Sequence, residues 1–297
     1  MQQAGGNLGS YVVSALREAD TAFNISILAR QSSTSKFPSG ILVHRTDYSK
    51  ESLLAIFKGQ DAVVSTIATD SLAVQQTIID AAAEAGVKRF IPSEYGIDTS
   101  NSTAPDYVPD TKLKQDVHAR LRTKESLGMS WTAIIVGVWF DWGIGTGIMS
   151  WDIPNRKAVI YNTGDEHYCG ANLERIAEGI VKTLQRPEET KNQFVYVRSH
   201  RTTQNEVIAL LEKFTGVKWE IEKARTEEAT AKGKRLLKEG DDLFGLVYTV
   251  LGALYGVPSL SDFEEKAQYW SKKLDIEKED LEETVRRVVE EVEARKQ

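Results

Sequence analysis

The feature that most constrains this chain of 297 residues is a glycine-rich run that stands almost at its amino end. Gly5, Gly6 and Gly9 enclose Asn7 and Leu8, and a helical pattern follows the run. A turn of this kind between a strand and a helix brings backbone N–H groups up to a pyrophosphate, and its glycines allow the close approach. The run therefore predicts a dinucleotide-binding turn, with a generic turn as the alternative reading.

Composition narrows the class of protein. The net charge is −6 and no basic stripe stands out, so we expect no nucleic-acid partner. Cys169 is the only cysteine, which excludes an intrachain disulfide and favours a reducing, cytoplasmic location. No apolar run reaches the roughly 18 residues of a membrane span, and no secretory signal is visible. We expect a small-molecule substrate and no membrane partner.

Strand and helix patterns alternate through the first half of the chain. Buried strands are predicted at 24–30, 40–45, 61–67, 87–91 and 131–136, and helices near 9–17, 52–57, 73–85 and 112–124. Short connections between such elements are typical of a parallel sheet covered on both faces. We predict an α/β fold, a Rossmann-type doubly wound sheet, with a nucleotide-binding domain at 1–150. Residues 151–297 are expected to complete the sheet and to form a smaller substrate subdomain.

Two charged residues stand at predicted strand ends. Arg30 ends the second strand of the expected fold, where the ribose of the adenosine would lie, and an arginine there suits the 2′-phosphate of NADP. A solvated loop arginine is the alternative. Asp47 ends the following strand, where it is either a neighbour of the adenine or a cap for the short helix that follows.

Several segments resemble one known family. They are Ala4 to Ser10, Leu28-Ala29-Arg30, Val63 to Thr66, Gly86-Val87-Lys88-Arg89-Phe90-Ile91-Pro92-Ser93-Glu94-Tyr95-Gly96 and Gly137 to Trp142. The chain resembles the NmrA-like and isoflavone-reductase-like proteins, which are atypical short-chain dehydrogenase/reductase relatives, and is most similar to fungal members. Gly6 and Gly9 match the second and third glycines of the family's G-x-x-G-x-x-G pattern, and Gln3 stands where the first should be.

The resemblance also implies a strand before the glycine turn. Only three residues precede Ala4 in this sequence, which is too few for that strand. In this fold that first strand is central, so without it two inner strands lose their ladder partners. The sequence allows two explanations: a chain that is incomplete at its amino end, as from a misplaced start codon, or drift away from cofactor binding. The intact downstream motifs favour the first.

The resemblance implies a catalytic lysine at the start of the helix predicted at 112–124. Lys114 matches best, Lys112 is possible, and a solvated helix lysine is the alternative. His118 shares a helix face with Lys114. A solvated or helix-surface role is the expected one for it, and assistance in proton transfer is the alternative. The cofactor NADP(H) is expected to contact Gly6, Asn7, Leu8 and Gly9 at the pyrophosphate, Arg30 and Asp47, and Thr66, Ile67, Pro92 and Ser93 at the strand ends.

Substrate contacts are harder to place. Trp139 and Phe140, with Trp142 close by, are candidates to wall a flat apolar substrate, although core packing is as good a reading for one of the three. His167 stands in a loop that is expected to border the substrate. The four histidines and Cys169 show no metal-ligand spacing, so no metal is expected. Tyr269 and Lys273 have the spacing of the ordinary short-chain dehydrogenase pair, which we treat as a chance match.

These features together predict an NADPH-dependent reductase that acts on a small aromatic or conjugated substrate. The alternative is a non-catalytic NADP-sensing regulator that acts through a protein partner, because the family contains that branch too. The tail at 280–297 has an amphipathic helical pattern. It is expected to dock on its own domain, with a partner-binding or dimer helix as the alternative.

Overall fold

The chain forms two compact units that interleave along the sequence in a computed structural model, which describes residues 5–295 except the side chains of residues 69 and 70. The first unit comprises Met1–Tyr95, Lys112–Ile135 and Ile176–Val195, and the second comprises Gly96–Thr111, Val136–Arg175 and Tyr196–Gln297. The prediction for Gln3 lies outside the described residues. Residues 176–195 thus return to the first unit after 136–175 have built part of the second.

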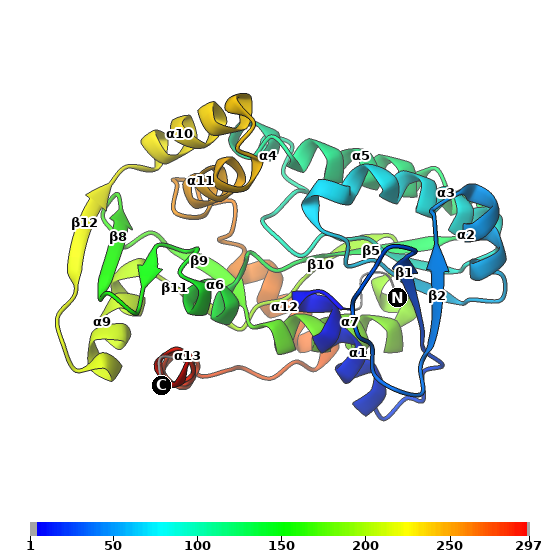
Figure 1. The fold of residues 1–297 in the computed structure, drawn as a ribbon, viewed down its shortest axis with the longest axis horizontal. Coiled ribbons are helices and arrows are strands. Elements are labelled where there is room, and N and C mark those ends of the chain that lie inside the picture. Colours follow the sequence, from blue (N-terminus) through cyan, green and yellow to red (C-terminus); the bar gives the residue numbers. More distant parts are fainter. Residues whose placement is uncertain (1–4, 296–297) are drawn as a thin grey trace. The chain divides into compact units, whose positions relative to one another are not determined.

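The first unit contains the predicted alternation of strands and helices (Figure 1). Its strands are β1 (Ser26–Arg30), β2 (Leu42–Thr46), β3 (Ala62–Val64), β4 (Arg89–Ile91), β5 (Ser130–Ile135) and β10 (Gln193–Tyr196). Its helices are α1 (Asn7–Glu18), α2 (Lys50–Phe57), η1 (Thr69–Val74), α3 (Gln75–Glu84), α5 (Thr111–Arg122), η2 (Glu125–Leu127), α7 (Leu173–Gln185) and α8 (Pro187–Thr190). The strands β3 and β4 are shorter than the sequence pattern predicts.

The strands of the first unit form two parallel-paired groups. β1 pairs with β2 in a two-stranded sheet, from Ser26 opposite Leu42 to Arg30 opposite Thr46. The second group has the order β10-β5-β4-β3, in which β3, β4 and β5 are parallel. A small cavity of about 20 Å³ is lined by both β1 and β3. Within the described residues, β1 and β3 therefore belong to separate hydrogen-bonded sheets, and the resemblance places the first strand of the fold between them.

Helices cover both faces of these strands, as the predicted fold class requires (Figure 1). On one face, α2, α3 and α5 bury apolar side chains against Leu28 of β1, Phe90 of β4 and Trp131 of β5. On the other face, Val13 of α1 packs with Ile27 of β1. Ile27 and Leu28 serve opposite faces because successive strand residues point to opposite sides. Each fully buried aliphatic or aromatic side chain stabilises the unit by about 1.5–3 kcal/mol.

Gly86 ends the α3 segment as its sequence position predicts. Its φ of 85° lies in the left-handed region that residues with a Cβ rarely adopt. The N–H groups of Gly86 and Val87 donate to the carbonyls of Ala83 and Ala82 at 3.2 and 3.0 Å. This turn satisfies the last carbonyls of α3 and directs the chain into β4.

The second unit is built from short strands and several helices. Its strands are β6 (Val138–Trp139), β7 (Trp151–Asp152), β8 (Lys157–Tyr161), β9 (Tyr168–Ala171), β11 (His200–Thr202) and β12 (Glu220–Ala224). Its helices are α4 (Ala104–Tyr107), α6 (Phe140–Thr146), α9 (Gln204–Thr215), α10 (Thr226–Glu239), α11 (Asp242–Leu254), α12 (Glu264–Leu274) and α13 (Leu281–Ala294). The strands form two three-stranded sheets, ordered β11-β9-β6 and β12-β8-β7.

The amphipathic tail forms α13 and docks on its own unit. Val285, Val288 and Val292 are buried in the main core of the second unit. The helix contacts α6 and α9 of the same unit. The prediction that the tail covers its own domain is therefore confirmed, because the apolar stripe is occupied by this packing.

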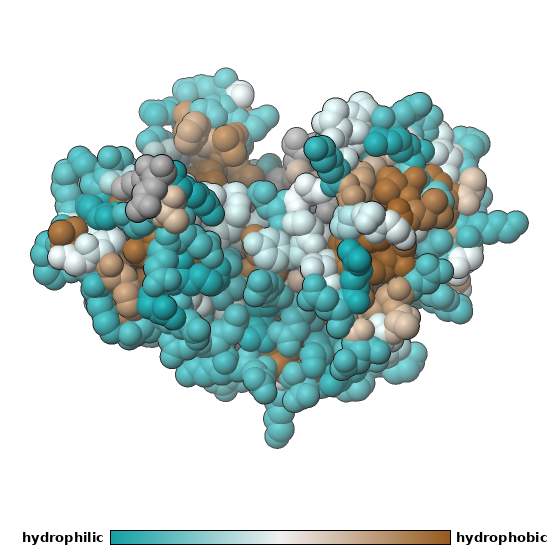
Figure 2. All heavy atoms as spheres, turned by 60° about the horizontal axis from the view of Figure 1, so that its bottom comes forward, coloured by the Kyte–Doolittle hydropathy of each residue, from teal (hydrophilic) through white to brown (hydrophobic). Residues whose placement is uncertain are grey.

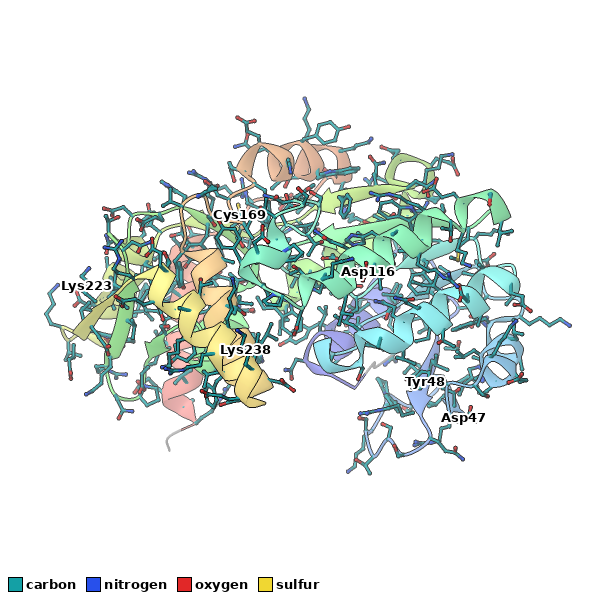
Figure 3. The ribbon with its side chains drawn as sticks, turned by 90° about the horizontal axis from the view of Figure 1, so that it is seen from above. Asp47, Tyr48, Asp116, Cys169, Lys223 and Lys238 are labelled. Atoms are coloured by element: carbon teal, nitrogen blue, oxygen red, sulfur yellow. The ribbon has the colours of Figure 1, made fainter. Side chains whose placement is uncertain are left out.

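The surface is mostly hydrophilic on the face drawn in Figure 2, with hydrophobic residues gathered in separate areas. Among the described residues, no helix has both the length and the apolar character to cross a membrane. Cys169 is buried in β9, and burial raises the pKa of its thiol to about 12 (Figure 3). The single cysteine therefore stays protonated and chemically inert at neutral pH.

His200 makes the stability of the second unit pH-dependent. It is buried on β11 with its Nε2 3.0 Å from Thr284 Oγ1, and burial lowers its pKa to about 4. As the pH falls below 6.5, His200 takes up a proton in the unfolded chain but stays neutral in the folded chain. The free energy of unfolding therefore decreases between pH 6.5 and about 4. We expect His200→Gln to remove about 2 kcal/mol of the stability difference between pH 7 and pH 5.

The measurement is urea unfolding of parent and variant at both pH values. The matched control is His167→Gln, which removes an exposed histidine of the same unit. Equal losses of unfolding free energy in the parent and in His200→Gln would contradict the assignment to His200.

Candidate functional site

A buried carboxylate lies at the centre of the first unit's candidate site. Glu94 follows β4 and is only 2% exposed. The Nε2 atom of His118 lies 2.6 Å from Glu94 Oε2. Lys114 donates from Nζ to the main-chain oxygen of Glu94, and its Nζ lies 4.0 Å from Oε1. A buried charge is tolerated when it is paired and hydrogen-bonded, and both partners come from one face of α5 at i and i+4.

His118 differs from its predicted solvated role. It is 2% exposed, and its ring contacts Phe194 of β10 edge to face, with 4.9 Å between ring centroids. Trp131 of β5 lies 6.3 Å away on a nearly parallel plane. The prediction that His118 is solvated was wrong, because the face of α5 that carries His118 packs onto the sheet. The i, i+4 spacing alone does not reveal this packing.

The structure separates the two candidate lysines of α5. Lys112 forms an ion pair with Asp116, one turn along the exposed side of the helix (Figure 3). The Lys114 side chain is 17% exposed and reaches the buried Glu94. Lys114 is thus partly accessible to solvent and contacts a buried carboxylate residue, whereas Lys112 lies on the solvated surface.

The glycine turn leads directly into α1. Gly6 is the N-cap, with φ −83° and ψ 175°, and no side chain accepts a hydrogen bond from the helix N-terminus. The first turn, which begins with Asn7 and Leu8, contains no acidic residue. Gly5 has Ser35 so close that an added Cβ would lie 2.7 Å from the serine Cβ. The N-terminus of α1 therefore presents N–H groups and a positive dipole end that suit an anion.

Charged residues stand at the ends of β1 and β2. Arg30 ends β1 and is exposed. Arg45 donates to the main-chain oxygen of Ser33 at 2.7 Å, which holds the loop that follows Arg30. Asp47, beside Tyr48 in Figure 3, accepts a hydrogen bond from the Ser49 N–H at 2.9 Å, and this bond lowers the pKa of Asp47. The N-cap of α2 is Ser49, so Asp47 shapes the turn rather than capping the helix itself.

The ends of β3 and β4 are tied together by side chains. Ser93 donates from Oγ to the main-chain oxygen of Ile67 at 2.7 Å, and its N–H donates to Gln75 Oε1 at 2.8 Å. Within the described residues, the buried Gln75 Nε2 has no hydrogen-bond partner. Thr66 and Pro92 are neighbours of these residues in the chain. The ends of β3 and β4, which carry the predicted residues, are thus held together by Ser93. The amide nitrogen of Gln75 is a buried hydrogen-bond donor beside them.

The predicted substrate residues all belong to the second unit. Phe140 is fully buried in its main core and contacts the ring of His200. Trp139 and Trp142 are partly exposed and meet edge to face, with 5.6 Å between ring centroids. His167 is exposed in the connection between β8 and β9. Phe140 thus has the core position that the sequence allowed for one of the aromatic residues.

Sequence reasoning assigned no role to Glu94 or Gln75. A faint signal for Glu94 exists, because it stands directly after Pro92-Ser93, where the fourth predicted strand ends and ligand-facing residues are common. No signal marks Gln75, which begins α3 far from the motifs in the chain. A search of the described residues for three or more clustered histidine, cysteine or acidic side chains suited to a metal ion finds none.

The fold and this arrangement of strand ends are those of Rossmann-type α/β proteins. Residues 2–139 match the model of the NmrA-like family. The chain is 37% identical to "Oxidoreductase aprR" of Aspergillus flavus, over 86% of this chain and 83% of that protein. It therefore belongs to the NmrA-like family.

Solved structures share the fold over nearly the full length. A structure described as "AtPrR2 with NADP+ and (+)pinoresinol" has a TM-score of 0.77 and 23% identity, and covers 97% of each chain. A crystal structure of an isoflavone reductase has a TM-score of 0.74 and 20% identity, and covers 97% of this chain and 96% of that one. At these identities the likeness shows the fold.

Proposed function

We propose that this chain is an NADPH-dependent reductase that reduces a small aromatic or conjugated acceptor. The observation that carries the proposal is the cluster of Lys114, Glu94 and His118, which sets a partly accessible ammonium against a buried carboxylate and imidazole. An ammonium and an imidazole held against one carboxylate are groups that can give and take protons in acid–base chemistry. The oxidoreductase name of the Aspergillus flavus relative supports a reductase.

The first unit fits an anionic dinucleotide in three respects. The N-terminus of α1 has no side-chain cap, the exposed guanidinium of Arg30 ends β1, and Gln75 Nε2 is a donor without a partner in the described residues. The pyrophosphate would be held at Gly6, Asn7, Leu8 and Gly9 and the 2′-phosphate by Arg30, while Asp47, Thr66, Ile67, Pro92 and Ser93 would line the rest. The structural relative solved with pinoresinol also has NADP+ bound, which supports this choice of cofactor.

The bound cofactor would supply the hydride, and the residues of this chain would manage the proton. Lys114 would hold a ribose hydroxyl and give a proton to the acceptor oxygen as negative charge develops there. Glu94 orients the ammonium through its main-chain oxygen and keeps a negative charge nearby. His118, in contact with the same carboxylate, would hold Glu94 in place, and Lys114 would regain its proton from solvent on its accessible side. Trp139 and His167 remain proposed neighbours of the substrate, whereas Phe140 belongs to the core of the second unit.

Replacing Lys114 tests the catalytic part of the proposal. We expect Lys114→Ala to lower kcat by about 10²- to 10⁴-fold, because general acid catalysis contributes that much. The matched control is Lys112→Ala, which removes the exposed lysine of the same helix and should leave kcat within about two-fold of the parent. The measurement is NADPH oxidation with a panel of quinones and aromatic enones. Tight NADPH binding without oxidation by any of these acceptors would contradict a reductase and would favour the sensing alternative.

Replacing Arg30 tests the choice of cofactor. A charge-assisted hydrogen bond contributes about 1.5–3 kcal/mol, so Arg30→Ala should weaken NADPH binding by about 10- to 100-fold. NADH lacks the 2′-phosphate, so its dissociation constant should change by less than three-fold and serves as the internal control. The measurement is a fluorescence titration of the reduced nicotinamide with the folded protein. An equal effect on both cofactors, or no NADPH signal in the parent at millimolar concentration, would contradict the assignment.

A further inference from the structure

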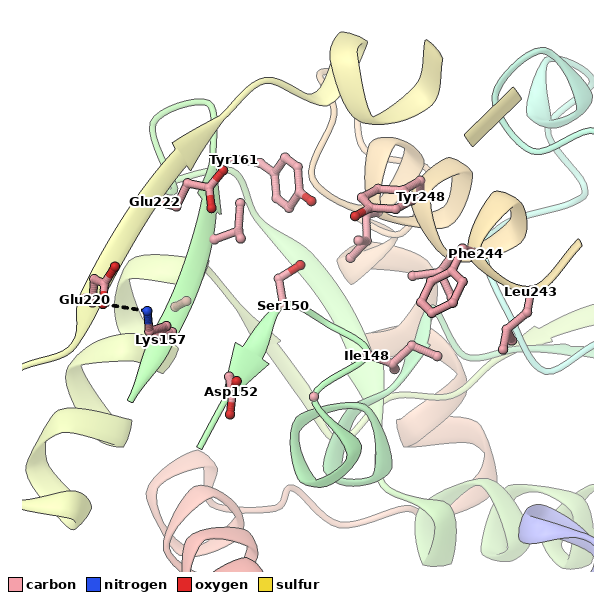
Figure 4. Close-up of a pocket in the computed structure, with 15 residues that line it drawn as sticks. Ile148, Ser150, Asp152, Lys157, Tyr161, Glu220, Glu222, Leu243, Phe244 and Tyr248 are labelled. Atoms are coloured by element: carbon pink, nitrogen blue, oxygen red, sulfur yellow. Dashed lines mark ion pairs between the residues drawn. The ribbon is translucent and has the colours of Figure 1, made fainter. Parts of the chain in front are cut away.

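A second cavity lies wholly within the second unit (Figure 4). It is bounded by α11 on one side and by β7, β8 and β12 on the other. Its volume of about 460 Å³ falls in the range of cavities that bind small molecules. The proposed cofactor and proton-transfer residues of the first unit do not line it, so the reductase proposal leaves this cavity without a role.

The α11 wall of this cavity is apolar and open to solvent. Leu243 and Phe244 stand in the first turn of α11 and are 64% and 55% exposed. Val247 and Leu251 continue the same wall further along the helix, and Ile148 faces it in Figure 4. Large exposed apolar side chains beside a cavity are typical of a surface that binds an apolar ligand, because binding removes them from water.

The strand wall is polar and carries excess negative charge. Asp152, Glu220 and Glu222 contribute three carboxylates, while Lys157 is the one basic residue among the 15 lining residues. Lys157 is already paired, with its Nζ 2.9 Å from Glu220 Oε2. Asp152 stands opposite Lys157 in the β7–β8 pair and accepts hydrogen bonds from Asn155 at 3.1 and 2.8 Å. Glu222 is therefore the carboxylate of the lining that has no ion-pair partner within the described residues. Such a wall attracts a positive charge and repels a negative one.

Aromatic rings lie between the two walls. Tyr161 and Tyr248 both line the cavity, and Figure 4 shows Tyr161 beside Glu222. The negative charge of Glu222 acts on Tyr161, whose pKa is raised chiefly by burial and in part by this carboxylate. Lys232 already lies over the ring of Tyr248, with its Nζ 3.9 Å from the ring centroid. Tyr161 is stacked on Tyr255. The rings of Tyr161 and Tyr248 therefore supply flat apolar surface rather than a free cation site. The cavity thus presents rings, aliphatic groups and carboxylates within one small space.

We propose that this cavity binds a small aromatic molecule that carries a positive charge, such as an aryl-alkyl amine. The rings and the aliphatic wall of α11 would hold the aromatic part, and the carboxylate of Glu222 would hold the ammonium. The site lies within one unit and needs no nucleotide. Its occupancy therefore stands or falls independently of the reductase proposal.

The test compares three ligands of the same ring system by isothermal titration calorimetry without nucleotide. They are 2-naphthylmethylamine, 2-naphthylmethanol and 2-naphthoate, which are positive, neutral and negative at pH 7. We expect the amine to bind at least ten-fold more tightly than the carboxylate, and its advantage to shrink with added salt because partly exposed charges are screened. Equal affinities of the three ligands, or no binding by a protein shown to be folded, would overturn the proposal.

Variants locate the site. Glu222→Gln should weaken binding of the amine by about three- to five-fold, as expected for a partly exposed ion pair, and leave the alcohol unchanged. Glu222→Lys should weaken the amine by at least ten-fold. Glu228→Lys on α10 makes the same change of charge at an exposed residue outside the cavity lining, and should have little effect. Equal losses in the two lysine variants would show an effect of net charge alone and would overturn the site.

Phe244→Ala tests the apolar wall and the alternative occupants. Because the side chain is largely exposed, the fold should tolerate its loss, and binding of amine and alcohol should weaken to a similar degree. Sedimentation of the parent protein is the complementary measurement. A parent dimer that dissociates in Phe244→Ala would overturn the proposal in favour of a second copy of the chain on this wall.

Discussion

The burial of the Glu94 carboxylate is the constraint on which the candidate site depends. A carboxylate removed from water costs several kcal/mol unless it is paired and hydrogen-bonded. At Glu94 the partners are His118 and Lys114, both supplied by α5. Helix α5 must therefore lie and be rotated so that Lys114 and His118 reach the end of β4. There they form the hydrogen bonds and the ion pair that the buried Glu94 requires. The same requirement that stabilises the unit thus assembles an acid–base cluster.

The packing around the cluster shows why this arrangement persists. His118 is enclosed by the aromatic rings of Phe194 and Trp131 from β10 and β5. These rings keep water away from the imidazole side of Glu94, while Lys114 remains partly accessible. The cluster therefore has a closed side, which holds its geometry, and an open side. Preorganisation of this kind is what distinguishes a potential catalytic group from a solvated lysine such as Lys112.

Much of the fold could be predicted from the sequence, because the spacing of apolar residues alternates along the chain between the pattern of a buried strand and that of an amphipathic helix. The strands at 26–30 and 130–135 and the helix at 111–122 lie within a few residues of their predicted positions. The helices α10 and α11 were not predicted, since α10 is rich in charged residues and buries few side chains, and α11 is apolar almost all round. The site was predictable only in part. Lys114 followed from resemblance, but the burial of His118 depends on long-range packing that local spacing does not contain.

The two strand groups of the first unit show how the proposed nucleotide-binding edge depends on elements besides backbone pairing. β1 and β3 belong to separate groups of strands, yet both carry side chains of the same apolar core, Leu28 and Val63. Helix α2 joins them, because Phe57 packs in that core and lines the small cavity between the two strands. Among residues 5–295, the position of Arg30 relative to the β3 end therefore rests on side-chain packing, because no hydrogen-bonded ladder joins β1 to β3 there. Side-chain packing is less directional than a backbone ladder, so Leu28, Phe57 and Val63 together position the Arg30 end of β1 in the proposed cofactor site.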